Sequence, residues 1–321
     1  MDRTVTPFLT SAEPIPIDRP FTTRWARAQG VDPRRLREWV RAGLLMTPVH
    51  GVMHAAQLVD SLELRLDCLR LVVPEDAVVT DRTAAWLHGA PMVLEPDAHR
   101  LVPRVDVFLL PGGRIRRPVA RSGQRQLLSS EIEELGGIRV TSRLRTMCDL
   151  GMKLPRKPAF AAMCSMLKVA DFTLDDVRRQ ADGRFRGHRW VRQLRALAPH
   201  CDPRFESPGE CSLALIWLET PGLPPFEPQF RVQGPVGSYY LDFGVPDLRY
   251  GAEYYGAEWH GPSQAQADQA RLDWLENTEG WRFGIFGADD VRGTGQIASD
   301  RLLRDIAEAR RTLASRRRVV T

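Results

Sequence analysis

The sequence lacks the cysteine patterns of a zinc site or a disulfide framework. Its 321 residues include five cysteines, an odd number, and no two of them form a C-x-x-C pair. Closely spaced cysteine pairs are typical of structural zinc, and an even number is typical of secreted disulfide scaffolds. The pattern argues against both classes, and reduced thiols predict a cytoplasmic protein.

Long apolar runs are also missing. No stretch approaches the roughly 20 apolar residues that cross a bilayer. The first ten residues, MDRTVTPFLT, lack the charged-then-apolar order of a signal peptide. We therefore expect no membrane partner. The P-loop, the G-x-G-x-x-G fingerprint and the G-x-S-x-G elbow are absent too, so ATP-driven translocation and serine-hydrolase chemistry have no support.

The composition is that of a mildly basic globular protein. A length of 321 residues predicts about two domains, and a hydrophobic content of 43% is enough for a sizeable core. The net charge of +5 and the pI of about 9.2 fit a nucleic-acid partner. Arginine far outnumbers lysine, which suits bidentate contacts to phosphate and guanine. A GC-rich genome is the alternative explanation.

The pattern along the chain predicts a multi-domain α+β or α/β protein. Residues 1–20 carry four prolines and read as a loosely held arm, and residues 21–60 have the helix, helix, short-strand order of a winged helix-turn-helix. Residues 61–200 read as a middle region of mixed α/β and helical structure. The run PHCDPRFESPG at 199–209 is the best linker. Residues 206–315 predict a second unit of helix, two strands, helix, strand and helix.

A basic helix follows Asp32 and Pro33, which are typical of a helix start. One face carries an apolar stripe, and the other carries four arginines: Arg34, Arg35, Arg37 and Arg41. Such a helix fits a DNA major groove, where arginine contacts guanine or phosphate. We take these four residues as candidate nucleic-acid-binding residues. The alternative is an ordinary solvated arginine face.

Two alternating apolar and polar runs joined by a Pro-Asp turn predict a β-hairpin over residues 239–255. If Val245 lies opposite Tyr250, Asp242 lies opposite Glu253. Directly opposed residues have Cβ atoms roughly 5 Å apart. Two carboxylates that close repel each other unless a cation lies between them, so the hairpin predicts a site for Mg²⁺ or Mn²⁺.

Two further residues complete the candidate site. Glu210 begins a helix after Ser-Pro-Gly, and His260 follows the second strand. A carboxylate-bound metal can activate water and stabilise the leaving oxygen in phosphodiester hydrolysis. We therefore expect Glu210, Asp242 and Glu253 to bind metal and, with His260, to form the catalytic set. The alternatives are a Glu210 that only caps its helix, a carboxylate pair that faces solvent, and a His260 without a catalytic role.

The order of helix glutamate, strand aspartate and strand glutamate resembles the PD-(D/E)XK nuclease superfamily. Residues 206–292 are more closely similar to bacterial domains related to very-short-patch repair endonucleases. The shared marks are the DF after Leu241, the segment EYYGAEWH that ends at His260, the strand WRFGIF and the following DDVR. The resemblance implies a metal on the Asp242 and Glu253 carboxylates.

The same resemblance implies that Glu210 orients water or metal and that His260 acts in proton transfer or phosphate contact. Tyr255 stands where E-x-K has its lysine, and a tyrosine neither carries that charge nor serves as a good base near pH 7. The very-short-patch enzymes also lack this lysine and use a nearby histidine, a role open to His260. The departure at Tyr255 still counts against catalysis.

The N-terminal region resembles a second family. Residues 21–150 are similar to abortive-infection-type antitoxins, on the segments TDRTAAWLHGA and VTSRLRTMCDL. In that family the winged helix binds DNA, often the operator of its own operon. The resemblance implies the same role for the helix that carries Arg34 to Arg41.

The leading hypothesis from sequence is a metal-dependent DNA endonuclease with an N-terminal DNA-binding module, acting in defence against foreign DNA or in repair. The alternative is a transcriptional repressor or antitoxin-like regulator with an inactive nuclease fold, which Tyr255 favours. An RNA-acting nuclease is a third reading. A homodimer, a cognate toxin and a methylase stay open as partners beside DNA.

Overall fold

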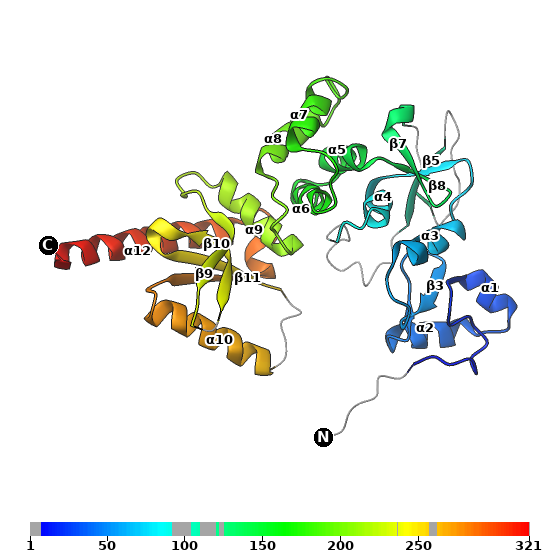
Figure 1. Cartoon of the computed structure of the whole chain (residues 1–321), viewed down its shortest axis with the longest axis horizontal. Coiled ribbons are helices and arrows are strands. Elements are labelled where there is room, and N and C mark those ends of the chain that lie inside the picture. Colours follow the sequence, from blue (N-terminus) through cyan, green and yellow to red (C-terminus); the bar gives the residue numbers. More distant parts are fainter. Residues whose placement is uncertain are drawn as a thin grey trace. The chain divides into compact units, whose positions relative to one another are not determined.

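The structure is a computed structural model that describes residues 8–91, 104–109, 120–121, 125–235, 237–256 and 262–320. It divides into two compact units. Unit 1 comprises Met1–Leu150 and Val169–Arg186, and unit 2 comprises Gly151–Lys168 and Gly187–Thr321. Figure 1 shows the elements of each unit. The architecture is mixed α/β in both.

Unit 1 begins with a small helical part. It contains β1 (Phe21–Thr22), α1 (Thr23–Ala28), α2 (Pro33–Arg41), β2 (Leu45–Met46) and β3 (Val52–Ala55), and the strands form a sheet of order β1-β3-β2. Helix α2 starts where Asp32 Oδ1 accepts a hydrogen bond of 2.7 Å from the backbone N–H of Arg34. Its apolar stripe is buried through Leu36 and Trp39. The two helices and the strand pair after them lie where the sequence pattern predicts them.

The rest of unit 1 surrounds a five-stranded mixed sheet of order β6-β5-β4-β8-β7. Its elements are α3 (Leu62–Arg70), β4 (Ala77–Val79), α4 (Asp81–Leu87), β5 (Val105–Leu109), β6 (Ala120–Arg121), η1 (Ser129–Glu131), β7 (Ile132–Leu135), β8 (Ile138–Thr141), α5 (Arg143–Lys153) and α7 (Leu174–Asp182).

A chain of ion pairs crosses the interior of unit 1. Asp149 of α5 accepts from Arg145 Nε at 2.9 Å and from Arg125 Nη1 at 2.8 Å, and Arg125 Nη2 continues to Asp81 at 2.7 Å. Asp149 is 1% exposed. Because a buried charge is costly unless it is paired, these contacts tie α4, α5 and the segment around Arg125 together.

Unit 2 is built around a four-stranded sheet of order β12-β11-β10-β9. Strand β11 runs parallel to β12, and the other two pairs are antiparallel. Helix α10 makes the crossover that a parallel pair requires. The elements are α6 (Arg156–Leu167), α8 (Val191–Leu197), η2 (Ala198–His200), α9 (Pro208–Glu219), β9 (Glu227–Gln233), β10 (Ser238–Val245), η3 (Pro246–Leu248), β11 (Tyr250–Tyr255), α10 (Pro262–Asn277), β12 (Arg282–Gly287), α11 (Ala288–Val291) and α12 (Gln296–Val320).

Aromatic packing fixes α9 on this sheet. Trp217 of α9 stacks on Phe243 of β10 with ring centroids 6.0 Å apart, and Phe226 packs edge-on against Phe243 at 5.0 Å. A second cluster joins Leu241 to Leu275 of α10. Both clusters bury the strands that carry the predicted carboxylates, so those side chains are set on a rigid base.

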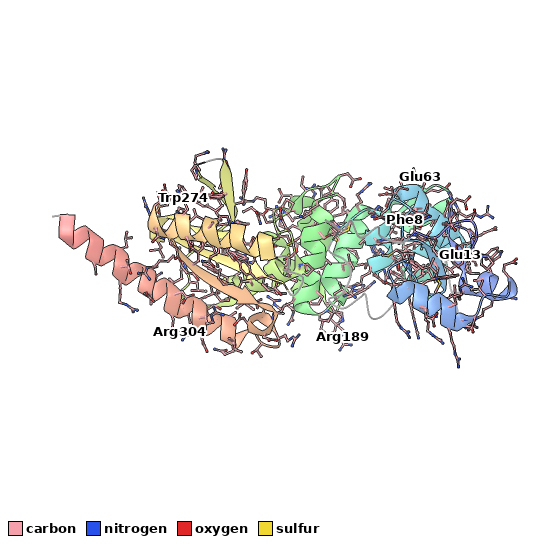
Figure 2. The ribbon with its side chains drawn as sticks, turned by 90° about the horizontal axis from the view of Figure 1, so that it is seen from below. Phe8, Glu13, Glu63, Arg189, Trp274 and Arg304 are labelled. Carbon is pink, nitrogen blue, oxygen red and sulfur yellow. The ribbon has the colours of Figure 1, made fainter. Side chains whose placement is uncertain are left out.

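Exposed arginines and buried cysteines without disulfides are both features of the structure. Arg189 and Arg304 extend away from the ribbon (Figure 2), and both are exposed. All five cysteines are buried and free. In the part of the chain that the structure describes, no helix has the length and apolar character needed to cross a bilayer.

Candidate functional sites

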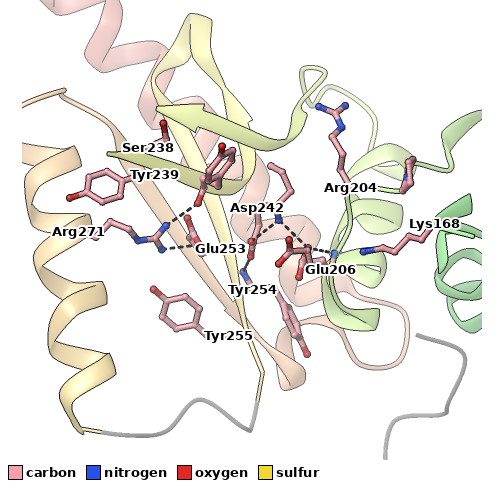
Figure 3. A pocket seen from close by; sticks show the side chains of 14 residues that line it. Lys168, Arg204, Glu206, Ser238, Tyr239, Asp242, Glu253, Tyr254, Tyr255 and Arg271 are labelled. Carbon is pink, nitrogen blue, oxygen red and sulfur yellow. Dashed lines mark hydrogen bonds and ion pairs between the residues drawn. The ribbon is translucent and has the colours of Figure 1, made fainter. Parts of the chain in front are cut away.

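A cleft of about 840 Å³ opens in unit 2 beside β10, β11 and the start of α9. The three predicted carboxylates, Glu210, Asp242 and Glu253, all line it. Figure 3 shows Asp242 and Glu253 among the lining side chains. The other lining residues are largely aromatic, basic or amide-bearing: Lys168, Pro203, Arg204, Glu206, Gln229, Ser238, Tyr239, Tyr240, Tyr254, Tyr255 and Arg271. The structure therefore brings together the described members of the predicted set.

The hairpin register explains how the carboxylates meet. Val245 pairs with Tyr250, which is the register assumed in the sequence analysis, and Phe243 pairs with Ala252. The next step of this register sets Asp242 against Glu253. The ladder between β10 and β11 ends at Phe243 and Ala252, one step before that pair. The ladder between β9 and β10 also omits Asp242, because it passes from Leu241 to Phe243. The backbone N–H of Tyr254 instead donates to Asp242 Oδ2 at 2.8 Å.

Gln229 faces the same point from β9. Its amide Nε2 lies 3.4 Å from Asp242 Oδ1 and 3.5 Å from Glu210 Oε2. Its backbone has φ of +50°, an uncommon value for a residue with a side chain. Such strain is typical of functional sites, where the fold holds a side chain in place. Sequence reasoning missed Gln229, because nothing in the local pattern marks a left-handed residue inside a strand.

Glu210 holds two roles at once. It follows Ser207, whose hydroxyl accepts from the Glu210 N–H at 3.1 Å, and its own Oε2 accepts from the backbone N–H of Glu206 at 2.8 Å. The side chain thus stabilises the start of α9, as the capping alternative holds. It is also 6% exposed and lines the cleft. Capping and membership of the site are therefore compatible.

The carboxylates shift one another's protonation. Burial raises the pKa of Glu210 to about 7, and the charge of Asp242 adds to the shift. Burial likewise raises the pKa of Asp242 to about 7, with a further contribution from the charge of Glu253. The cleft therefore tolerates its full negative charge poorly near neutral pH and favours a proton or a cation.

A cation of the chain itself lies beside Glu253. Arg271 reaches from α10 into the cleft, where its Nη2 donates to Glu253 Oε2 at 3.2 Å and its Nη1 donates to the carbonyl of Tyr240 at 2.9 Å (Figure 3). Glu253 is 4% exposed. Sequence reasoning missed Arg271, which comes 18 residues after its partner on a helix with no basic motif.

The tyrosines offered a sequence signal that went unused. All five tyrosines of the chain fall between residues 239 and 255, and four of them line the cleft. Tyr254 lies so close to the start of α9 that a Cβ on Gly209 would be 1.9 Å from its ring. Gly209 thus allows the ring to close one side of the cleft.

The metal hypothesis stays a prediction, and the cleft bears on it only through the types of oxygen donor that line it. Carboxylate and amide oxygens are the ligands that hard divalent cations prefer, and Asp242, Glu253, Glu210 and Gln229 offer them in one cleft. Among the described residues, no three His, Cys, Asp or Glu side chains are arranged as a metal site. His260 lies outside the described residues. Tyr255 lines the cleft at the lysine position of E-x-K.

The predicted DNA-binding arginines lie together on α2 in unit 1. Arg34, Arg37 and Arg41 follow helical i, i+3, i+7 spacing and are exposed. Arg35 is also exposed, and its guanidinium lies 4.8 Å from the ring centre of Trp39. Leu36 and Trp39 lie on the opposite face and are buried. The helix therefore presents a positively charged outer face.

The described architecture defines a multi-domain mixed α/β protein. Residues 77–200 match the family model of the AbiEi antitoxin C-terminal domain. The search of curated proteins finds no match. The family match supports the antitoxin part of the sequence resemblance. It does not extend to residues 206–292, where the similarity to very-short-patch repair endonucleases stays a prediction.

Proposed function

We propose that the chain is a DNA-binding regulator of the antitoxin class. The observation that carries this proposal is the match of residues 77–200 to an antitoxin family domain. The sequence places a candidate DNA-binding helix before that region, as in the antitoxins that it resembles. The regulator reading, which the sequence offered as the alternative, is thus better supported than the endonuclease reading.

Helix α2 is the proposed DNA contact. Its outer face carries Arg34, Arg37 and Arg41, and none of them has an ion pair within the described ranges. Arginine forks suit phosphate and guanine, and a helix fits the major groove. Each phosphate contact releases counterions, so binding should weaken steeply as salt increases.

The test is duplex binding measured by fluorescence anisotropy, using the DNA upstream of the chain's own gene. A variant with Arg34, Arg37 and Arg41 changed to alanine should bind at least about tenfold more weakly and lower the salt slope by up to about 3. A control with Arg304, Arg310 and Arg311 of α12 changed to alanine removes the same charge elsewhere. Equal losses in both variants would contradict a specific role for α2.

The antitoxin match also favours a protein partner, a cognate toxin encoded beside this chain. Co-expression of the neighbouring gene with the full chain tests this directly. Relief of the neighbour's growth inhibition by the chain is expected. An absence of any toxic neighbour would leave DNA as the one proposed partner.

A second candidate function is metal-dependent phosphodiester hydrolysis in the unit 2 cleft. It is favoured by the three carboxylates that line one cleft and by the raised pKa values of Glu210 and Asp242. Asp242, Glu253 and Glu210 would hold Mg²⁺ or Mn²⁺. The bound ion would supply an activated water and charge stabilisation. Defence and repair are both compatible roles.

A plasmid cutting assay with Mg²⁺ or Mn²⁺ tests the second candidate, comparing the parent with Asp242→Asn and Glu253→Gln. Metal-dependent cleavage by the parent alone would support it. Cleavage that both variants retain would remove these residues from the site. No cleavage by the parent, with duplex binding intact, would leave the regulator function standing alone.

A further inference from the structure

We propose that Arg271 is the resident counter-ion of the carboxylate pair and that a divalent cation binds the cleft by displacing it from Glu253. The inference rests on the second candidate function, because it takes the carboxylates as cation ligands. It adds a competitor to the site. The positive charge that neutralises Glu253 comes from the chain itself, and the cation must replace it.

The contact between Arg271 and Glu253 is long for an ion pair. The Arg271 Nη2 to Glu253 Oε2 distance is 3.2 Å, longer than the 2.7–2.9 Å typical of strong charge-assisted hydrogen bonds. The Glu253 side chain is 5% exposed, whereas that of Arg271 is 17% exposed. The glutamate is thus fixed in the wall of the cleft, and the arginine approaches it from the more open side.

A second contact keeps the guanidinium in place after release. Arg271 Nη1 donates to the backbone carbonyl of Tyr240 at 2.9 Å, and that bond does not involve Glu253. A divalent cation carries twice the charge of the guanidinium, so it attracts the carboxylates more strongly at equal distance. The cation can therefore replace Arg271 at Glu253 while the guanidinium stays in the cleft, and the remaining repulsion between the two positive charges is what Arg271→Gln would remove.

The displaced arginine would then face a ligand. A guanidinium that no longer donates to Glu253 is well suited to donate to a phosphate group. It would also supply the positive charge that Tyr255, at the lysine position, does not carry. Arg271 is in this view a positioning residue that reports whether the cation is bound.

The test is Mn²⁺ binding to the full chain, followed by electron paramagnetic resonance of free Mn²⁺. Arg271→Gln keeps amide donors but removes the charge, and it should bind Mn²⁺ at least about fivefold more tightly than the parent, corresponding to roughly 1 kcal/mol. Arg271→Lys keeps the charge and should stay close to the parent. Arg282→Gln is the matched control, since Arg282 pairs with Glu308 on the surface.

Thermal unfolding provides a second measurement, because the loss of Arg271 leaves a buried carboxylate without this partner. Mn²⁺ should raise the midpoint of Arg271→Gln more than that of the parent. Equal Mn²⁺ affinities and equal midpoint shifts for the parent and Arg271→Gln would overturn the exchange while leaving the cation site. Failure of both proteins to bind Mn²⁺ would overturn the cation site itself, and with it the second candidate function.

Discussion

Gln229 shows how one backbone angle can set a side chain. A residue with a Cβ pays roughly 1–2 kcal/mol in the left-handed region, and Gln229 has φ of +50°. We expect Gln229→Gly to be more stable than Gln229→Ala by about 1 kcal/mol, because both lose the amide but only glycine relieves the backbone. Urea unfolding measures the difference. An alanine variant as stable as the glycine variant would show that the strand carries no strain there.

Asp242 makes the stability of the folded chain depend on pH, and the sign of this dependence follows from its pKa. Its pKa is raised to about 7 in the folded state from an unfolded value near 4. The folded state therefore binds more protons between these values, so its stability is greatest below the unfolded pKa and falls as pH rises through about 7.

We expect Asp242→Asn to be more stable than the parent at pH 8 by about 1–2 kcal/mol, with little difference at pH 4 in the absence of divalent cations. Thermal unfolding at the two pH values measures this. A variant that is less stable at pH 8 would show that the hydrogen bond from the Tyr254 N–H to Asp242 outweighs the cost of the charge. Asp305→Asn is the comparison away from the cleft. Burial also raises the pKa of Asp305, so this variant shows how much of the effect comes from burial alone.

At the scale of elements, the contact between α9 and β11 depends on a missing side chain. A Cβ on Gly209 would lie 1.9 Å from the Tyr254 ring, whereas a Cβ on Gly256 would approach the same ring no closer than 3.9 Å. We expect Gly209→Ala to destabilise unit 2 by about 1–3 kcal/mol through overpacking, despite the higher helix propensity of alanine.

The matched substitution Gly256→Ala should change the free energy of unfolding by less than about 0.5 kcal/mol. Urea unfolding of both variants makes the comparison. If Gly209→Ala stabilises the protein, then the Tyr254 ring moves aside freely, and the cleft wall is softer than the packing indicates.

Sequence patterns predicted the hairpin of this site, but they did not reveal the residues that other elements contribute to it. The alternation in 239–245 and the Pro-Asp turn were enough to predict the hairpin and to suggest the register in which Val245 lies opposite Tyr250, because strand register depends on the local pattern and on the turn. Gln229 and Arg271 come from other elements and reach the cleft through tertiary packing. Their local sequence carries no sign of a carboxylate partner, so the pattern could not reveal them.

At the scale of the whole molecule, the residues that match the antitoxin family extend into unit 2 and include one that lines the cleft. Residues 77–200 include α6 and α8, which belong to unit 2, and Lys168 at the end of α6 lines the cleft. The linker predicted at 199–209 therefore does not coincide with the limits of the two compact units. Composition alone could not reveal this, because helices are assigned to units by packing, not by their neighbours in sequence.

The proposed duplex contact and the carboxylate cleft lie in different units, and sites without shared partners usually act additively. We expect the double variant Asp242→Asn, Glu253→Gln to bind the upstream duplex within about twofold of the parent, and the triple α2 variant to bind Mn²⁺ with unchanged affinity. Anisotropy and Mn²⁺ titration of each variant measure both properties. Weaker duplex binding by a folded carboxylate variant would mean that the cleft contacts the duplex, and regulation and cleft chemistry would then share one nucleic acid.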